Sequence, residues 1–329
     1  MSSKPQAILE HMPFHIKKNI AAAVSNVWDR ASLRKVSKTF RSLVDSTQNF
    51  PLPMVFFCDL DNIQLGSGSQ TIQYTNSRDG CLVKCYSGNV VVSEKLIPRR
   101  YFTEQAAADY ASYLLNPRQN VKDLSISFAK GFTDTDDTTV AKVHAFFCTL
   151  GISLSQLKQQ MGVEKLEMHF FGSPDHVMSV LPYINPETLK VVALTDKLSP
   201  RTPIDISSIM CSEAFKTPKE VVFLHLTPTA FPVNETTLEF KQFAVYADPT
   251  ISFSGSEFEN ILKMFNSSEK TEIWQIRAKF EELFLLNIFQ ENFEWDFEEE
   301  SGIYKVPSSN TTVRFRFGDD KHIIDFVKL

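Results

Sequence analysis

The sequence of 329 residues contains no long apolar stretch. No uninterrupted apolar run approaches the roughly 18 residues that a membrane-spanning helix needs. The N-terminus also lacks the charged start followed by an apolar run that is typical of a secretory signal. We therefore expect a protein of the cytoplasm, the nucleus or both, with no membrane partner.

Cysteine is scarce, and the pattern of the few cysteines excludes a disulfide framework. There are five, an odd number, and they are scattered along the chain. This usage indicates a reducing compartment, where thiols stay free. We predict mostly buried thiols at Cys58, Cys81, Cys85, Cys148 and Cys211.

Residue patterns for catalysis or metal binding are also missing. His11 and His15 are the only histidines at the helical i, i+4 spacing, and they lack an intervening glutamate and a third ligand. Cys81 and Cys85 have no second Cys or His pair nearby, which favours two core thiols. The stretch that starts at Gly66, GSGS, lacks the Lys-Ser/Thr ending of a phosphate loop and indicates a hairpin tip. We expect no metal, no cofactor and no enzyme, and rank an enzyme third among the functions considered.

What is present is an uneven distribution of charge. The net charge is −5, but residues 1–45 carry eight Lys/Arg and three Asp/Glu, a net of +5, which leaves −10 for the remainder. With 43% hydrophobic and 22% charged residues, the composition is that of a globular protein, and the length suggests about two units. The two ends of the chain are therefore expected to do different work.

Two short amphipathic helices are predicted in the basic N-terminal part. The first begins after Pro13 and carries its apolar residues at spacings of four, four and three. The second follows Asp29, a possible cap, and its apolar residues fall within an arc of about 100 degrees. The apolar positions are Ile16, Ile20, Val24 and Val27 in the first helix, and Leu33, Val36, Phe40, Leu43 and Val44 in the second. A bundle of about 45 residues buries too little surface to be stable alone, so we expect it to have a partner.

This segment resembles an F-box over residues 6–48. The resemblance rests on Met12-Pro13, Ile16 and Ile20, then LRKVSK from Leu33 and FRSLV from Phe40. It implies a small helical bundle that docks on the Skp-type adaptor of a cullin-RING ubiquitin ligase. The matching adaptor-binding positions are Met12, Pro13, Ile16, Ile20, Leu33, Val36 and Phe40.

Two other interpretations of these helices remain open. Their apolar faces could simply pack on the rest of the chain. The cations Arg34, Lys35, Lys38 and Arg41, which lie outside the apolar arc, could pair with phosphates. The segment has no recognisable recognition helix with polar base readers, so nucleic acid is not the partner we expect.

The remainder, residues 54–329, is predicted to be rich in strands. Short runs at 54–60, 70–74, 82–86 and 89–93 are separated by glycine-containing turns, which indicates a meander of hairpins. A helix is expected from about 103 to 116. Five apolar-x-apolar-x-apolar runs then follow, centred 21 to 42 residues apart on Ile126, Met168, Val191, Leu224 and Val245. They fit irregular leucine-rich-repeat-like units or an ordinary α/β sheet, and both give parallel strands with one long exposed face.

The C-terminal part combines a helix starting near Ser256 with five alternating strands. Phe258, Ile261, Leu262 and Phe265, then Ile273-Trp274, the run YKVPSSN from Tyr304 and the last two strands resemble the FTH domain of nematode-type F-box proteins. The resemblance covers about residues 110–329. It implies a role in recruiting a protein target.

A dense acidic segment, Glu291 to Glu300, interleaves carboxylates with aromatic residues. On a strand the aromatic residues would share one face, and Glu294, Asp296 and Glu298 the other. An edge strand whose charges deter sheet extension is one interpretation. A target-binding groove for a basic segment is the other.

Together these features predict an α+β protein, a small N-terminal helical bundle followed by a strand-rich α/β, leucine-rich-repeat-like domain. The expected function is that of a substrate receptor in a Skp-adaptor/cullin/F-box ubiquitin ligase, with an unknown protein target and no catalytic group of its own. The alternative is a stand-alone interaction scaffold without ligase association.

Overall fold

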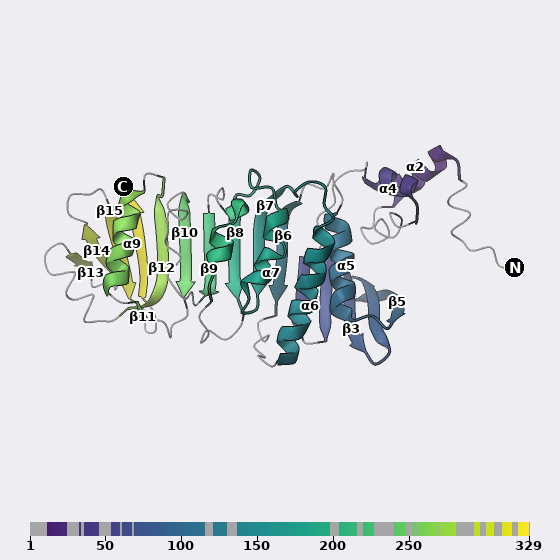
Figure 1. Ribbon diagram of the computed structural model, residues 1–329, viewed down its shortest axis with the longest axis horizontal. Helices are drawn as coiled ribbons and strands as arrows, with labels where there is room; N and C mark the ends of the chain where they lie inside the picture. The colour runs from purple at the N-terminus through teal and green to yellow at the C-terminus, as the bar shows by residue number, and fades with distance from the viewer. Residues whose placement is uncertain are drawn as a thin grey trace. The chain divides into compact units, whose positions relative to one another are not determined.

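The structure is a computed structural model, and the fold is α+β (Figure 1). The chain forms two compact units, residues 1–122 with 145–162, and residues 123–144 with 163–329. In the part that the structure describes, no helix is both long and apolar enough to cross a membrane. The described residues are 12–24, 33, 36–45, 54–59, 61–67, 69–115, 121–129, 137–197, 204–215, 220–226, 240–247, 252–253, 255–268, 270–280, 293–296, 301–305, 311–317 and 322–328.

The N-terminal helices α2 (Phe14–Ala23) and α4 (Lys38–Asp45) begin where the sequence provides start signals. The carbonyl of Pro13 accepts hydrogen bonds from the amides of Ile16 and Lys17, at 3.0 and 3.1 Å. The Ser37 hydroxyl accepts one from the amide of Phe40, at 3.2 Å, as a helix cap does. The predicted cap Asp29 and residues 46–53, where the boundary after the helical bundle is predicted, lie outside the described residues.

These helices have a hydrophobic cluster of their own, which we call the bundle core. Its buried members are Ala21, Leu33, Phe40, Leu43 and Val44, and Ile20, Val24 and Val36 pack against it partly buried. Ala21 is 1% exposed whereas Ile16 is 37% exposed. The side of α2 that faces the bundle core therefore contains the small residue Ala21 and leaves out Ile16, which the sequence predicted to lie there. A small residue at this position lets the two helices approach each other closely.

The first strand-rich region is an antiparallel meander, in which each strand pairs with the next along the chain. Gly80 and Gly88 stand at turns with positive φ, and a Cβ on Gly80 would collide with the carbonyl of Ile97. The strands are β1 (Met54–Asp59), β2 (Asn62–Ser67), β3 (Gln70–Ser77), β4 (Gly80–Ser87) and β5 (Val90–Pro98). The sequence-based prediction missed β2, because its polar and glycine-containing sequence resembles a loop.

Helix α5 (Phe102–Leu114) covers one face of the meander, which we call its inner face. The inner-face side chains Ile63, Leu65 and Tyr74 are buried. The Tyr74 hydroxyl donates a hydrogen bond of 3.0 Å to Oδ2 of Asp109 on α5. The predicted helix at 103 to 116 is confirmed, and it completes the core that the hairpins alone could not form.

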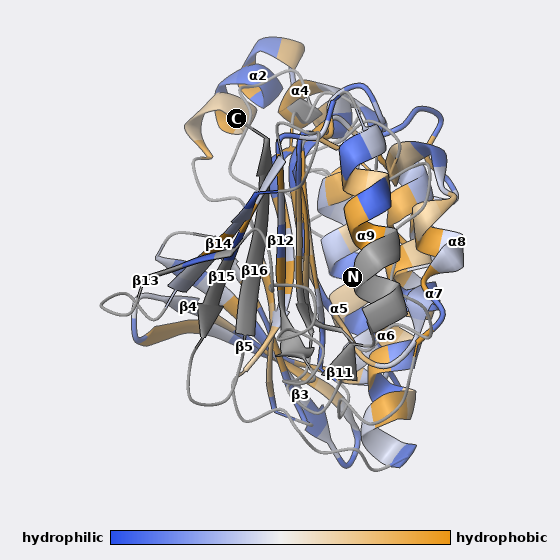
Figure 2. Ribbon diagram, turned by 90° about the vertical axis from the view of Figure 1, so that its left-hand side faces the viewer, coloured by the Kyte–Doolittle hydropathy of each residue, from blue (hydrophilic) through white to orange (hydrophobic). Residues whose placement is uncertain are grey.

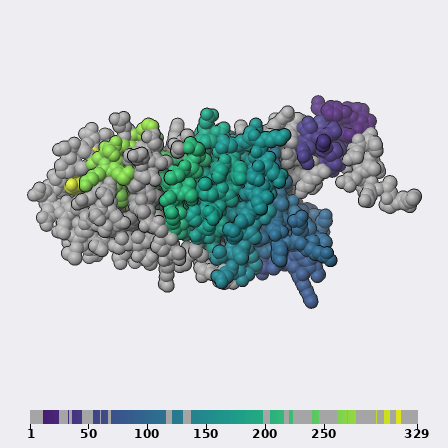
Figure 3. Space-filling view, in the orientation of Figure 1, coloured from purple at the N-terminus to yellow at the C-terminus, as the bar shows by residue number. Residues whose placement is uncertain are grey.

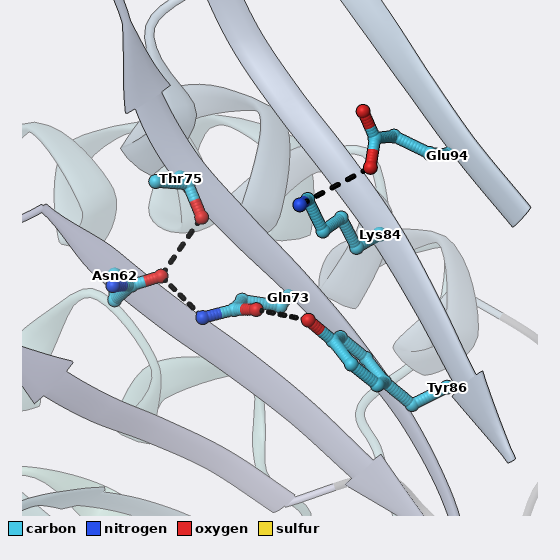
Figure 4. A network of polar contacts seen from close by, with 6 residues as sticks. All are labelled: Asn62, Gln73, Thr75, Lys84, Tyr86 and Glu94. Atoms are coloured by element: carbon cyan, nitrogen blue, oxygen red, sulfur yellow. Dashed lines mark hydrogen bonds and ion pairs between the residues drawn. The ribbon is translucent and has the colours of Figure 1, made fainter. Parts of the chain in front are cut away.

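The outer face of the meander is held by polar side chains (Figure 4). Asn62 Oδ1 accepts hydrogen bonds from Gln73 Nε2 at 2.6 Å and Thr75 Oγ1 at 2.8 Å. Tyr86 donates its hydroxyl hydrogen to Gln73 Oε1 at 2.8 Å. These bonds tie three neighbouring strands together across a face that has no helix among the described residues.

The second unit contains a sheet that is parallel in its first part and antiparallel in its last. In order across the sheet, the strands are β6 (Val121–Phe128), β7 (Val163–Phe170), β8 (Val191–Asp196), β9 (Glu220–Leu226), β10 (Gln242–Ala247), β12 (Ile273–Phe280), β16 (His322–Lys328), β15 (Thr311–Phe317), β14 (Ser301–Lys305) and β13 (Phe293–Asp296), with β11 (Ser252–Phe253) beside β12. Pairing from β7 to β10 is parallel, as predicted. The pairing of β10 with β12 is also parallel, and from β12 to β13 the pairing is antiparallel. The parallel order suits both interpretations of the five runs, and the repeat-like one stays a prediction.

Helices connect several of the parallel strands, and α7, α8 and α9 lie on one face of the sheet (Figure 2). The core rows on that face follow the strand register, with Leu166, Val192, Val221, Phe243 and Trp274 in one row and Met168, Leu194, Phe223, Val245 and Ile276 in the next, all at most 1% exposed. The helices are α6 (Asp137–Leu154, divided between the two units), α7 (Pro174–Met178), η1 (Leu181–Tyr183), α8 (Ser207–Met210), η2 (Glu213–Phe215) and α9 (Gly255–Ser267). This sheet thus buries its apolar residues on one side.

The cysteines correct one prediction. All five are free, as expected for a chain without a disulfide framework. Only Cys81 is buried, however, while Cys58 and Cys85 are half-buried and Cys148 and Cys211 are exposed. The prediction of mostly buried thiols is wrong, because Cys148 falls on the outward side of α6, whose apolar positions Phe146, Phe147 and Leu150 point inward.

Candidate protein-binding surfaces

The predicted adaptor-binding residues fall into three settings in the N-terminal helices. Pro13 and Ile16 are exposed, Met12, Ile20 and Val36 are half-buried, and Leu33 and Phe40 are buried. Phe40 is 0% and Leu33 9% exposed, and both belong to the bundle core. A contact with an adaptor would thus use the exposed Pro13 and Ile16 directly, and it would depend on the buried Leu33 and Phe40 for the shape of the bundle. The assignment of the seven residues stays a prediction.

An exposed apolar patch surrounds the start of α2, and we call Pro13, Phe14 and Ile16 the α2 patch. Phe14 is 63% exposed and Ile16 37%. The sequence-based prediction did not include Phe14, although its place directly after Met12-Pro13 was a usable signal. The helices appear as the purple surface in Figure 3. Large apolar side chains that stay exposed beside a complete core are typical of a protein-binding site.

The cations of the second helix agree with the predicted orientation where they are described. Lys38 and Arg41 are exposed, and the amide of Arg41 bonds the Ser37 carbonyl at 2.9 Å. Arg34 and Lys35 lie outside the described residues. Two outward cations on one short helix are an ordinary solvated face and give no specific sign of nucleic-acid binding.

The second candidate surface is the face of the parallel sheet opposite α7, α8 and α9, on which no described helix lies and which we call the open face. Its side chains alternate with the buried rows, and most are half-buried or exposed. A pocket on it lies over β9, β10 and β12, with Glu220, Gln242 and Gln275 as its polar residues and Val222, Ala244 and Ile273 as its apolar ones. Small side chains at the centre and polar groups around them offer both contact area and hydrogen bonds. The sequence predicted a long exposed face but could not place this pocket.

The acidic segment forms the edge strand β13, which has β14 as its neighbour in the sheet order. Glu294 is exposed and pairs with Lys305 of β14, Nζ to Oε1 at 3.0 Å. The backbone of Asp296 lies in β13, but its side chain and the whole of Glu298 lie outside the described residues. The edge position is confirmed for residues 293–296, and the role of the charges in deterring sheet extension stays a prediction. The target-binding role of the three carboxylates stays a prediction, and in the structure one of them already has a cationic neighbour.

The second unit contains a buried histidine whose pKa is strongly shifted. His176, on α7, is 1% exposed, and its Nδ1 accepts a hydrogen bond of 3.3 Å from the amide of Phe171. Burial, and to a lesser extent the nearby His144, lower the pKa of His176 to about 4. A neutral imidazole enclosed in this way supports the backbone at the end of β7 and is inaccessible to a substrate.

The described residues contain no group of three or more His, Cys, Asp or Glu side chains that could hold a metal ion. The hairpin interpretation of Gly66 to Ser69 is confirmed, since β2 ends at Ser67 and β3 begins at Gln70. His15 is exposed, and His11 lies outside the described residues.

Comparison with known families places one domain in this chain. The model of the FTH domain matches residues 145–292, so the predicted FTH domain is confirmed over that range. No curated protein and no solved structure matches the chain. The FTH match includes the strands from β7 to β12 with their connecting helices, and therefore the open face and its pocket.

Proposed function

We propose that the protein is a substrate receptor of a Skp-adaptor/cullin/F-box ubiquitin ligase. In this role the N-terminal helices bind the adaptor, and the region that contains the FTH domain holds a protein target. The α2 patch is the observation that carries the proposal. It exposes Phe14 and Ile16, while other apolar residues of the same helices form the buried bundle core.

The energetic argument starts from these exposed side chains. Burying a large apolar side chain against a partner contributes roughly 1.5–3 kcal/mol. A few such anchors at the centre of an interface supply most of its binding free energy. Phe14 and Ile16 lie two positions apart at the start of α2, where Pro13 fixes the approach of the chain.

Such a receptor acts by proximity. A target that is tethered near a ubiquitin-loaded enzyme has a high effective concentration there, and transfer accelerates without any acid, base or nucleophile from the receptor. The FTH domain would supply the target site, for which the pocket with Glu220, Gln242 and Gln275 is the best-defined candidate. Glu220 has no ion-pair partner among the described residues, and its carboxylate beside the two amide side chains favours a target segment with a cation and hydrogen-bond donors.

The test uses the full chain with a purified Skp-type adaptor. Replacing Phe14 and Ile16 together by Asp should weaken the complex by about 100-fold or more, because both anchors become charged. Asn19→Asp is the charge control, since Asn19 is exposed on the same helix and the substitution adds one of the two negative charges without removing an apolar side chain. A third variant, Phe40→Ala, reports the effect of a disturbed bundle core.

The outcomes separate the two functions considered. Adaptor binding by the wild type and the Asn19→Asp variant, with loss in the Phe14/Ile16 variant, supports the receptor. Absence of adaptor binding by the wild-type chain would leave the stand-alone scaffold. Binding that survives both Asp substitutions would show that the α2 patch is not the adaptor site.

A further inference from the structure

We propose that the free edge of the meander, strand β5, binds an extended peptide segment by strand addition. The segment is acidic at one end and rich in β-branched residues at the other. This site lies outside the FTH match and is independent of the adaptor.

The first observation is the position of β5 in its sheet. It is the last strand in the order, and in the described part of the chain it pairs only with β4. Its outer edge therefore presents backbone N–H and C=O groups that a further strand can pair with. Residues 93–97 form a regular run opposite 81–85, so five consecutive residues offer an even template.

The second observation is the apolar surface of this strand. Val90, Val91, Val92 and Leu96 are 66, 46, 60 and 42% exposed. Val91 lies opposite Tyr86 and Leu96 opposite Leu82, on the outer face, whereas Val90 lies opposite Ser87. Apolar residues on both faces of one edge are covered together by an added strand, whereas a helix or a flat surface would reach one face only.

The edge also has features that prevent indiscriminate pairing. The register shifts between Ser93 and Val91, so Val92 is an extra residue in β5, and Pro98 ends the strand. Lys84 and Glu94, paired at 3.1 Å, place opposite charges across β4 and β5 on the outer face (Figure 4). Bulges, prolines and charges are the means by which edge strands avoid aggregation. An edge that keeps exposed valines despite these features is suited to selective pairing.

Charge defines the occupant. Glu94 already has a cationic partner, whereas Lys95, Arg99 and Arg100 are exposed and have no ion-pair partner among the described residues. Residues 78–100 carry five Lys/Arg and two Asp/Glu, a net of +3. A second copy of the chain would bring two such hairpins side by side and is disfavoured by repulsion. An acidic peptide is attracted, and in the antiparallel orientation its N-terminal end lies beside Arg99 and Arg100.

The probe is a fluorescein-labelled octapeptide, DEDVTVTV, titrated against the full chain and followed by fluorescence anisotropy. Two further versions carry N-methyl groups, either on the three valines or on the two threonines. Because alternate amides of a strand point to opposite edges, one N-methylated version should lose binding by about tenfold or more and the other should keep it. A third version, NQNVTVTV, tests the acidic end.

Two variants and one control test the protein side. Val91→Ser with Leu96→Ser should weaken the acidic peptide about tenfold, because the apolar contacts are lost while the charge of the edge is unchanged. Arg99→Glu with Arg100→Glu should weaken DEDVTVTV about tenfold but leave NQNVTVTV unchanged. Ile152→Ser is the control, since this α6 residue of the same unit is 70% exposed.

Equal loss in both N-methylated versions, or in neither, would overturn strand addition. So would no saturable binding of DEDVTVTV up to about 1 mM, or unchanged binding by the Val91/Leu96 variant. Self-association of the wild type in sedimentation equilibrium that the same variant abolishes would assign the edge to a second copy instead. The Phe14/Ile16 variant should bind the peptide normally, which keeps this test separate from that of the proposed receptor function.

Discussion

The meander and the parallel sheet of the second unit differ in how their strands pair and in how their apolar faces are covered. In the meander, each strand pairs with its sequence neighbour across a tight turn, and α5 covers a modest inner face. In the parallel sheet, every pairing spans a long connection, and large aromatic residues fill the helix-covered side. Pairing of sequence neighbours closes short loops at a small entropy cost, so a modest core is sufficient. Pairing of distant segments closes long loops at a larger entropy cost, which deep burial of apolar side chains has to offset. The difference predicts where each region is vulnerable.

The largest effect is expected from Trp274 in the parallel sheet. This side chain is 0% exposed and packs against Phe243 at 5.8 Å and Phe265 of α9 at 5.3 Å between ring centroids. Trp274→Ala should lower the free energy of unfolding of the second unit by about 4 kcal/mol, because a large cavity is left. Urea denaturation followed by circular dichroism measures this.

Trp274→Phe is the matched control. It keeps most of the ring and removes an indole N–H that has no hydrogen-bond partner among the described residues, so its loss should be much smaller. Hydrogen exchange of meander amides sharpens the comparison. If these amides lose protection to the same extent in Trp274→Ala, the two regions unfold as one and the contrast between them fails.

A pH effect should follow next in size. The pKa of His176 is lowered from 6.5 to about 4 by burial and by His144, so the unfolded chain binds the proton more tightly than the folded one. The stability that depends on the neutral imidazole is complete above about pH 6.5 and is lost as the pH falls to about 4. The loss is at most about 3 kcal/mol.

Thermal unfolding between pH 7.5 and 4 detects this loss. In His176→Gln the corresponding part of the pH dependence should vanish, since no group there takes up a proton. His144→Gln should reduce it only slightly, because burial is the larger cause of the shift. An identical pH profile in His176→Gln and the wild type would contradict the assignment.

In the meander the main polar contact of the core is the hydrogen bond from Tyr74 to Asp109. Tyr74 is 0% exposed, and burial together with Asp109 raises the pKa of its hydroxyl well above 10.0. Tyr74→Phe should cost about 1.5–2 kcal/mol, because a carboxylate loses a neutral donor in a partly buried site. A loss near zero in chemical denaturation would show that α5 is held by its apolar residues alone.

The smallest effect is expected on the outer face of the meander. Lys84 and Glu94 are paired at 3.1 Å, with side chains 31 and 53% exposed. Lys84→Met should change stability by about 0.5 kcal/mol or less, since solvent screens the pair. A loss above about 2 kcal/mol would place this face among the determinants of the fold. Raising the salt concentration screens the pair, so it should change the free energy of unfolding of the wild type by a similarly small amount.

Much of the strand pattern could be predicted from the sequence. The alternation in Leu166, Met168 and Phe170 predicts a half-buried strand, and β7 has that burial pattern. Helices α5 and α9 followed from spacing and start signals. Strand β2 was missed because Asn62 faces outward into polar contacts and Gln64 alternates with the buried residues. Among the side chains of β2 that are described, only Ile63 and Leu65 are buried.

The candidate sites were less predictable. Ile16 and Phe40 belong to the same sequence motif, yet one is exposed and the other is buried in the bundle core. Periodicity identifies an apolar face but does not tell whether a partner or the chain itself covers it. The pocket over β9, β10 and β12 combines residues up to 55 positions apart, such as Glu220 and Gln275, which only strand register brings together.

The sequence by itself determined the local structure of this protein, the hairpin turns, the helix starts and the alternation of buried and exposed residues along each strand, because these depend on neighbours a few residues apart. Tertiary structure alone decided that Ala21 rather than Ile16 faces the bundle core, that Val90 to Val92 lie on an uncovered edge, and that two of the five thiols are exposed. The physical reason is that burial is a property of surfaces brought together from distant parts of the chain.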